Sequence, residues 1–279
     1  MTNLRKEYIQ LNRFSITIMF AMLTCHVFTQ ITLVSWNIKD FGHSREDFQI
    51  EAIANIIKDV DIVSIQEVVA KHPGGAKAVV RLVEELNRKG ARWDYSISLP
   101  TKSSSSYKSE RYAFLWKFHK VKLKTPARLI TNIENSVDRE PYYASFEVNG
   151  NELNILNFHG KPINEHPVDE LDHIFQIINA NQFSNWVFAG DFNLSEDHIA
   201  FDQFYQLGFS AVLNDQATTL KMKCDEGKYL NNAFDNIYFK LNDFNTNEGG
   251  VLDFIEDCNL LPQLRINLSD HLPVFVQLL

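Results

Sequence analysis

Short apolar runs recur along the whole chain, and they constrain its fold more than any other feature. The segments 31–36, 61–65 and 186–189 have the length and the β-branched and aromatic content of buried strands. Further strands are expected near 93–99, 111–117, 142–148, 152–158, 234–239 and 273–278. Asn149-Gly150 separates two of these runs and is typical of a tight β-hairpin.

Apolar residues at helical spacing alternate with these strands. The spacing predicts helices over 45–59, 76–89 and 167–181, and a shorter helix over about 197–207. The serine-rich segment 101–109 is too polar for the core and is expected to be a mobile loop. Strands, hairpins and helices in both halves therefore predict a four-layer α/β/β/α sandwich, with two packed, mostly antiparallel sheets and the helices outside.

The length of the chain limits the number of domains, and its net charge limits the kinds of ligand that it can bind. The chain has 279 residues, 45% of them hydrophobic, and no linker or repeat divides it, so we expect one domain over residues 30–279. The net charge of −8 argues against non-specific coating of nucleic acid, which needs a basic face. A phosphodiester substrate remains compatible, because a divalent cation and a few arginines reverse the field within a cleft.

The first 29 residues have the layout of a secretory signal peptide. Arg5, Lys6 and Arg13 precede an uncharged stretch from 14 to 28, and cleavage is expected between Thr29 and Gln30. A retained membrane anchor and a lipoprotein at Cys25 are the alternatives. Cleavage predicts a secreted or periplasmic protein.

Cleavage after Thr29 also removes one of the three cysteines. Cys224 and Cys258 are left, and the sequence allows either a disulfide between them or two separate buried thiols.

Polar residues stand at the ends of the predicted strands. Because strand ends on one edge of a sheet share a face, we expect these side chains to converge on one cleft. They are Asn37, Glu67, His159, Asp191, Asn193, Asp235, Asn236, Asp270 and His271. Phosphodiester hydrolysis needs a base, an acid and positive charge on the phosphoryl oxygens. Two histidines held by carboxylates supply the first two, and a glutamate supplies an oxygen for a metal ion.

The order of these motifs resembles the endonuclease/exonuclease/phosphatase superfamily over residues 31–279. The motifs are Trp36-Asn37-Ile38, Gln66-Glu67-Val68, Asn157-Phe158-His159, Gly190-Asp191-Phe192-Asn193, Phe234-Asp235-Asn236-Ile237 and Ser269-Asp270-His271. Glu110-Arg111-Tyr112 and Arg139-Glu140-Pro141 narrow the resemblance to deoxyribonuclease I-like nucleases.

The resemblance implies a divalent-metal site and a phosphate site. Glu67 would bind a catalytic Mg²⁺ or Mn²⁺ ion with Asn37 close by, and Ca²⁺ is a further candidate. Asp191, Asn193 and Asp270 would hold the phosphate, the metal or the attacking water.

The resemblance also implies two acid–base pairs. Glu110 would orient His159 and Asp235 would orient His271, and the two histidines would act as general acid and general base across the scissile phosphate. Arg139 would contact a phosphate oxygen as a bidentate donor.

Two positions depart from the nuclease pattern. Val69 stands where the nuclease has an arginine that reaches into the DNA minor groove, and Tyr107 lies three residues before Glu110, where the nuclease has its groove-stacking tyrosine two residues before. Catalysis is therefore expected to be intact and the grip on duplex DNA weaker or different.

The leading hypothesis is a secreted, monomeric, metal-dependent and non-specific DNA endonuclease without stable membrane insertion after processing. The alternative is a phosphoesterase of the same superfamily that acts on a phospholipid head group, an inositol phosphate or a nucleotide. RNA is not excluded as a substrate. A non-catalytic binding module would have lost a histidine or a metal ligand, and every one of these motif residues is present.

Overall fold

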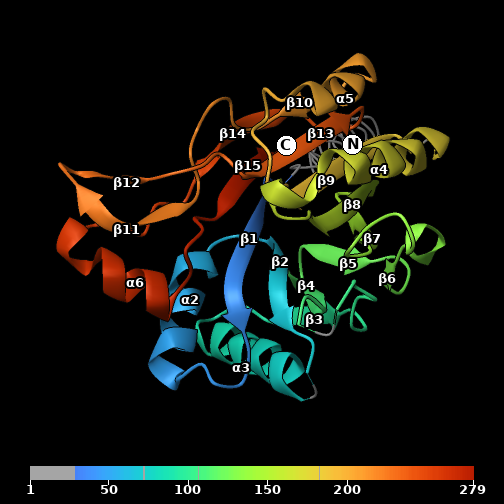
Figure 1. Ribbon diagram of the computed structural model, residues 1–279. Helices are drawn as coiled ribbons and strands as arrows, with labels where there is room; N and C mark the ends of the chain where they lie inside the picture. Colours follow the sequence, from blue (N-terminus) through green and yellow to red (C-terminus); the bar gives the residue numbers. More distant parts are fainter. Residues whose placement is uncertain (1–28, 72, 106, 182) are drawn as a thin grey trace, which may run out of the picture.

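The fold is built from two packed β-sheets, seen in a computed structural model that describes residues 29–279 except 72, 106 and 182 (Figure 1). The first sheet has the strand order β14-β15-β1-β2-β4-β3. Its strands are β1 (Ile31–Phe41), β2 (Ile62–Val69), β3 (Trp93–Ile97), β4 (Glu110–Lys117), β14 (Thr246–Val251) and β15 (Val274–Leu278). Within it β1 and β2 run parallel, and the other neighbours are antiparallel.

The second sheet has the order β10-β13-β9-β8-β7-β5, with β6 also paired to β7. Its strands are β5 (Val121–Leu123), β6 (Arg128–Leu129), β7 (Tyr142–Val148), β8 (Asn151–His159), β9 (Asn185–Asp191), β10 (Ser210–Ala211) and β13 (Asp235–Leu241). Only the β8–β9 pair among them is parallel. The mostly antiparallel sheets are as predicted.

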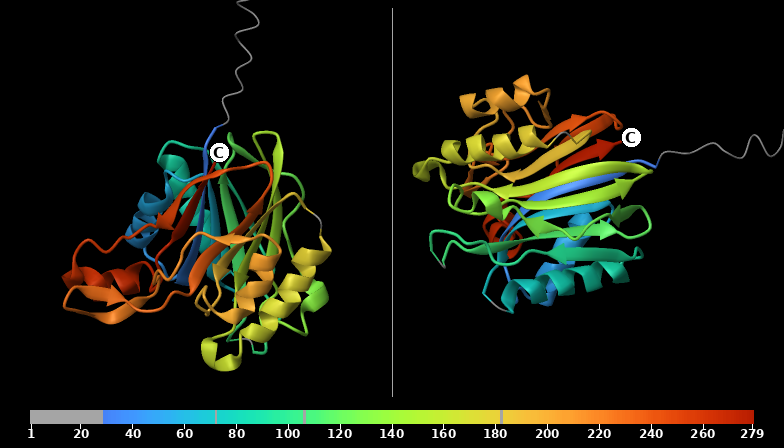
Figure 2. Two further views of the ribbon diagram at one scale, coloured as in Figure 1. Left: turned by 90° about the horizontal axis from the view of Figure 1, so that it is seen from above. Right: turned by 90° about the vertical axis from the view of Figure 1, so that its right-hand side faces the viewer.

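Helices cover the outer face of each sheet (Figure 2). Helices α2 (Asp47–Ile57) and α3 (Gly74–Arg88) pack on the first sheet, and α4 (Val168–Ala180) and α5 (Asp202–Gln206) pack on the second. Single 3-10 turns η1 (Thr131–Ile133), η2 (Ile163–Glu165) and η3 (Ile199–Phe201) lie in the connections. The four-layer prediction is confirmed.

Apolar side chains point alternately to the two faces of each sheet, and this produces three separate apolar layers. On β1, Leu33 faces the core between the sheets, whereas its neighbour Val34 faces the helices α2 and α3. On β9, Val187 faces the central core and Phe188 packs under α4 and α5. Successive side chains of a strand point to opposite faces, so a sheet covered on both sides needs the continuous apolar runs of this sequence.

Local signals explain several boundaries. Asn149 and Gly150 have φ values of 52° and 83° and join β7 to β8, as expected for a tight hairpin whose two turn residues are left-handed. Glu46 and Gln49 form a capping box at the start of α2. The described residues of the segment 101–109 form no strand or helix. Thr101 is nevertheless buried and its hydroxyl accepts from the Glu110 N–H, so the prediction that the segment stays outside the core is wrong at that residue.

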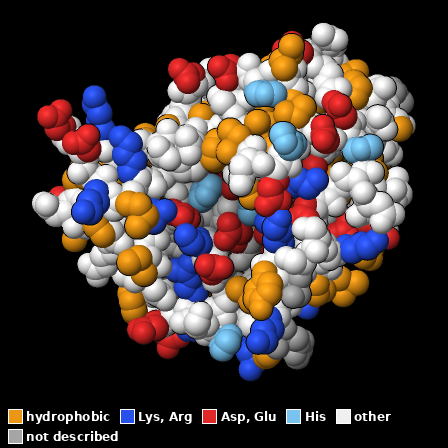
Figure 3. All heavy atoms as spheres, viewed as in Figure 1, with side chains coloured by type: hydrophobic (Ala, Val, Ile, Leu, Met, Phe, Trp, Pro, Cys, Tyr) orange, Lys and Arg blue, Asp and Glu red, His pale blue; other side chains and the backbone are white. Residues whose placement is uncertain are grey.

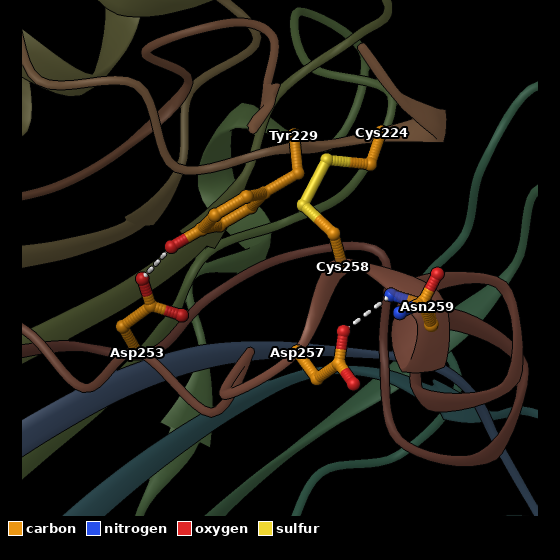
Figure 4. The surroundings of a disulfide bond; sticks show 6 residues. All are labelled: Cys224, Tyr229, Asp253, Asp257, Cys258 and Asn259. Atoms are coloured by element: carbon orange, nitrogen blue, oxygen red, sulfur yellow. Dashed lines mark hydrogen bonds between the residues drawn. A yellow bond between two sulfur atoms is a disulfide. The ribbon is translucent and has the colours of Figure 1, made fainter. Parts of the chain in front are cut away.

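A projecting arm was not predicted. It consists of the hairpin β11 (Leu220–Asp225) and β12 (Lys228–Leu230), the turn η4 (Cys258–Leu260) and helix α6 (Leu261–Asn267). These elements surround a small apolar cluster of their own and extend to one side of the sandwich (Figure 1). A disulfide joins Cys224 on the hairpin to Cys258 on η4, which resolves the question of these two thiols (Figure 4).

The predicted signal peptide lies outside the described residues, apart from Thr29. Within the part of the chain that the structure describes, no helix has the length and hydrophobicity needed to span a bilayer.

Candidate active site

Polar side chains of the central strands meet near one edge of the two sheets. Asn37 and Glu67 were predicted at strand ends but lie within β1 and β2, which continue to Phe41 and Val69. In the second sheet, His159, Asp191 and Asp235 are register neighbours on the adjacent strands β8, β9 and β13. In the first sheet, Asn37 on β1 is paired with Gln66 on β2. The Asn37 Nδ2 atom donates to Asp191 Oδ2 over 2.9 Å and connects the two sheets at this edge. The predicted convergence is observed for these residues, whereas the buried side chain of Asn236 hydrogen-bonds to the backbone of Leu213.

Gly190 allows the central strands to lie this close together. A Cβ atom at this position would lie 1.8 Å from the carbonyl oxygen of Phe158 on the neighbouring strand. The close approach at this glycine is to the backbone of the neighbouring strand. The residues that follow these two, His159 and Asp191, are thereby held side by side.

The first acid–base pair is His159 with Glu110. The Nδ1 atom lies 2.9 Å from Glu110 Oε2, and the ring is almost completely buried. Burial alone would lower the pKa of His159, but the charge and hydrogen bond of Glu110, together with the charge of Asp191, outweigh it and raise the pKa. Burial would likewise raise the pKa of Glu110, but His159 and Arg139 outweigh it and hold it below its ordinary value.

The second pair is His271 with Asp235. The Nδ1 atom lies 2.8 Å from Asp235 Oδ2, and the Thr218 hydroxyl donates to the same oxygen over 2.6 Å. Burial would lower the pKa of His271, but the carboxylates of Asp235 and Asp191 outweigh it and raise the pKa to about 10. The structure therefore brings together both predicted pairs.

Asp191 lies between the two histidines. Its Oδ2 atom is 3.6 Å from His159 Nε2 and 3.7 Å from His271 Nδ1. Burial raises the pKa of this carboxyl group, and repulsion by Asp235 adds to the increase, against the opposing charge of the histidines. A single buried carboxylate thus links two histidines that are each held by a different acid.

Asn37 and Glu67 offer hard oxygen atoms at the same edge. Glu67 accepts hydrogen bonds from Asn37 Nδ2 (3.0 Å) and the Asp40 N–H (3.1 Å). Its φ of 60° is left-handed, within the bulge where β2 shifts register against β4. Such bulges redirect side chains beside active sites, and the uncommon backbone conformation is consistent with a functional constraint.

The donor set fits a divalent cation. Both Asn37 Nδ2 contacts are to carboxylates, which fixes the amide orientation and leaves its buried Oδ1 atom without a hydrogen-bond partner among the described residues. Carboxylate and amide oxygens are the ligands that Mg²⁺, Mn²⁺ and Ca²⁺ accept. Asp191, Asp235 and His271 also offer ligand atoms within 4.8 Å of one another, but here the histidine and Asp235 already hold each other.

Asn193 and Arg139 both contact Gly160, the residue that follows His159. Asn193 has a left-handed φ of 52°, its N–H donates to Asp191 Oδ1, and its Nδ2 donates to the Gly160 carbonyl. Arg139 is nearly buried, with its Nε 3.0 Å from Glu110 Oε2 and its NH1 donating to the same Gly160 carbonyl. The arginine thus supports Glu110 directly, in addition to the phosphate contact that we expected of it.

Asp270 lies at the opposite margin. Its Oδ2 atom accepts from Lys39 Nζ and from Arg265 NH2, both over 2.9 Å. No hydrogen bond or ion pair of the described residues joins Asp270 to Glu67 or Asn37. The structure therefore places this predicted metal or phosphate ligand between two cations.

A cavity of about 370 Å³ opens beside Glu67, Glu110 and His159. Val69, Lys71 and Tyr107 also line it, so both positions that depart from the nuclease pattern face this cavity. Figure 3 shows acidic and histidine side chains near the centre of this face, with Lys and Arg side chains around them.

Several supporting residues were not predicted. The Ser269 hydroxyl donates to the Asn37 carbonyl and accepts from the His271 N–H, and the Tyr112 hydroxyl accepts from the His159 N–H. Serine, threonine and tyrosine are too common to single out by type. Ser269 and Tyr112 stand inside two of the quoted motifs, but their residue type does not indicate these contacts, and Thr218 lies outside every motif.

Known proteins match this chain over most of its length. Residues 34–271 match the Endonuclease/Exonuclease/phosphatase family. The chain is 24% identical to deoxyribonuclease gamma of Rattus norvegicus, over 92% of this chain and 87% of that protein. It is 25% identical to a deoxyribonuclease of Thioalkalivibrio sp. (strain K90mix), over 93% of this chain and 74% of that protein.

Solved structures show the same fold. An endonuclease/exonuclease/phosphatase family protein from Bacteroides thetaiotaomicron superposes with a TM-score of 0.64 at 18% identity, covering 90% of this chain and 97% of the other. With the match over most of its length, this chain belongs to the endonuclease/exonuclease/phosphatase family.

Proposed function

We propose that this nuclease or phosphoesterase of the family is a secreted, divalent-metal-dependent endonuclease that hydrolyses DNA phosphodiester bonds. The observation that carries the proposal is the pair of histidines on either side of Asp191, each held by its own carboxylate. Two such pairs provide a base for water and an acid for the leaving oxygen. The similarity to proteins named deoxyribonucleases supports DNA as the substrate.

Each residue then has a defined task. Asn37 and Glu67 would hold Mg²⁺ or Mn²⁺, which supplies positive charge to the phosphoryl oxygens. His159 and His271 would move protons on the two sides of the phosphate, with Glu110 and Asp235 fixing the tautomers.

Other residues would orient the phosphate or direct export of the protein. Asn193 and Arg139 would orient the phosphate. The uncleaved signal peptide, residues 1–29, would direct the chain out of the cytoplasm.

Histidine variants test the catalytic part of this proposal. In the presence of Mg²⁺, His159→Ala and His271→Ala are each expected to reduce plasmid cleavage by ~10²–10⁴-fold, the usual contribution of a proton-transfer partner. His119→Ala is the matched control, since this exposed histidine follows the opposite end of the strand that begins with Glu110. Near-normal cleavage by both site variants would refute the acid–base assignment.

A second candidate rests on one observation. Val69 lines the cavity beside the site, at the position where the deoxyribonuclease pattern has an arginine for the DNA minor groove, so this contact with duplex DNA is absent. Its absence favours a smaller phosphoester, such as a phospholipid head group, an inositol phosphate or a nucleotide. Release of product from one of these compounds, without plasmid cleavage, would favour this candidate.

A further inference from the structure

A second cavity adjoins the catalytic one on the side of the projecting arm. It has a volume of about 320 Å³ and lies between the end of β1, the start of α2 and helix α6. Asp40 lines both cavities, so the two meet beside Glu67. The residues that line the second cavity are Lys39, Asp40, Ser44, Arg45, Gln49, Arg265 and Ile266. We call it the basic pocket.

Positive charge predominates in the basic pocket, although the whole chain is acidic. Lys39 and Arg265 share a single carboxylate oxygen, Oδ2 of Asp270, so one negative charge faces two cations. Arg45 donates only to backbone carbonyls and has no carboxylate within ion-pair distance among the described residues. The exposed Asp40 is the one acidic residue in the lining itself. This excess of positive charge would attract an anion into the pocket.

The pocket is preorganised. Arg45 is buried and its guanidinium holds the carbonyls of Ile266 and Asn267, at the end of α6, together with the carbonyl of Lys39 at the end of β1. The Arg265 Nε atom donates to the Leu220 carbonyl, which fixes α6 against β11 within the arm. Binding here would require little ordering of the protein, which favours affinity.

Donors and an apolar surface stand next to each other at the opening. Lys39 keeps 45% of its side chain exposed and uses one N–H donor on Asp270. Ile266 is 73% exposed beside these cations. Cationic donors for a phosphate next to an aliphatic side chain for a sugar or base match one nucleotide unit. Figure 3 shows Lys and Arg side chains between the position of α6 and the centre of this face.

We propose that the basic pocket binds a phosphate that flanks the scissile one in a polynucleotide, through Lys39 and Arg265, with the attached nucleoside against Ile266. This inference rests on the proposed nuclease function and narrows its substrate to chains with more than one phosphate. Asp270 would then hold the two cations in place beside His271, its neighbour in the sequence.

The test is the salt dependence of binding to a fluorescein-labelled DNA duplex, followed by anisotropy in EDTA so that no cleavage occurs. Each lost phosphate contact should reduce the slope of log K against log salt by about 0.9. Lys39→Gln and Arg265→Gln are each expected to show this decrease together with several-fold weaker binding. Arg265→Lys keeps the charge and should restore the slope. Lys122→Gln, an exposed lysine on the distant edge strand β5, is the charge-matched control.

The outcomes separate this inference from the proposed function. Unchanged slopes in both Gln variants, in an enzyme that cleaves plasmid, would overturn the basic pocket alone. Failure of the wild type to cleave plasmid with Mg²⁺ would overturn the proposed function, and is measured in a different assay. Because nearly half of the Lys39 side chain is exposed, its variant reports on the pocket even if Arg265→Gln perturbs α6.

Discussion

Replacement of Gly190 by alanine tests whether the spacing of β8 and β9 sets the geometry of the active site. The added Cβ atom would lie 1.8 Å from the Phe158 carbonyl oxygen and 2.8 Å from its carbonyl carbon, and real Cβ atoms essentially never come closer than 3.0 Å to such atoms. Both clashing atoms are backbone, so no rotamer change can relieve them. The strands must separate, and the next residues on them are His159 and Asp191.

The magnitude follows from that displacement. Moving the contact from 1.8 Å to at least 3.0 Å shifts the strands by more than an ångström. Overpacking of this kind destabilises a protein by about 1–3 kcal/mol. A misplacement of about 1 Å between reacting groups reduces turnover by roughly 10²-fold. We therefore expect Gly190→Ala to lose both stability and activity.

Urea unfolding and Mg²⁺-dependent hydrolysis of bis(4-nitrophenyl) phosphate measure the two effects separately. Gly250→Ala is the matched control, because its added Cβ would meet only ring carbons of Phe275, at 3.3 and 3.7 Å, which can move. Wild-type turnover by folded Gly190→Ala protein would refute the idea that this strand spacing positions the catalytic groups.

Three further outcomes are expected. In metal-free protein, NMR titration should find the pKa of His271 near 10, and Asp235→Asn should lower this pKa. The pKa in the folded protein exceeds the value of about 6.5 in the unfolded chain. The stabilisation from this pair is therefore present below about pH 6.5 and is lost as the pH rises through 10. A titration midpoint at the ordinary histidine value would contradict the pairing. Replacing Cys224 and Cys258 by serine should lower the free energy of unfolding by at most about 3–4 kcal/mol, the closure entropy for their separation of 34 residues, as measured by urea unfolding. Glu110→Gln should lower kcat by at least about tenfold with a smaller change in KM, because it removes the charge that holds its histidine partner; an unchanged kcat and pH–rate profile would exclude that role.

The sequence predicted those parts of the fold that have a periodic signal. Apolar runs such as Trp186–Ala189 identified the buried strands, and Asn149-Gly150 identified a hairpin, because both patterns have a direct backbone cause. The edge strand β14 was missed, since its residues include Gly249 and Gly250 and little apolar content. Helix α6 is too short to show helical periodicity.

The candidate site was predicted in outline for the same reason. Residues such as Asn37 and Asp191 follow apolar runs, so their convergence could be inferred, although β1 continues past Asn37 to Phe41. The inward orientation of Arg139 toward Glu110 and the position of Asp270 between two cations depend on tertiary contacts that no local pattern encodes. Thr218 supports Asp235 from a loop, across 17 residues of chain, and leaves no trace in the spacing of the motifs.

The most direct test of the account is the substrate preference of the purified mature protein with Mg²⁺, with EDTA, and with Mg²⁺ restored after EDTA. Plasmid DNA, a phospholipid, an inositol phosphate and a nucleotide are compared at equal enzyme concentration. We predict that the protein cleaves plasmid with Mg²⁺, that cleavage is lost in EDTA, and that it returns when Mg²⁺ is added. Plasmid that stays intact while one of the small phosphoesters is hydrolysed would contradict it, as would cleavage that EDTA does not affect.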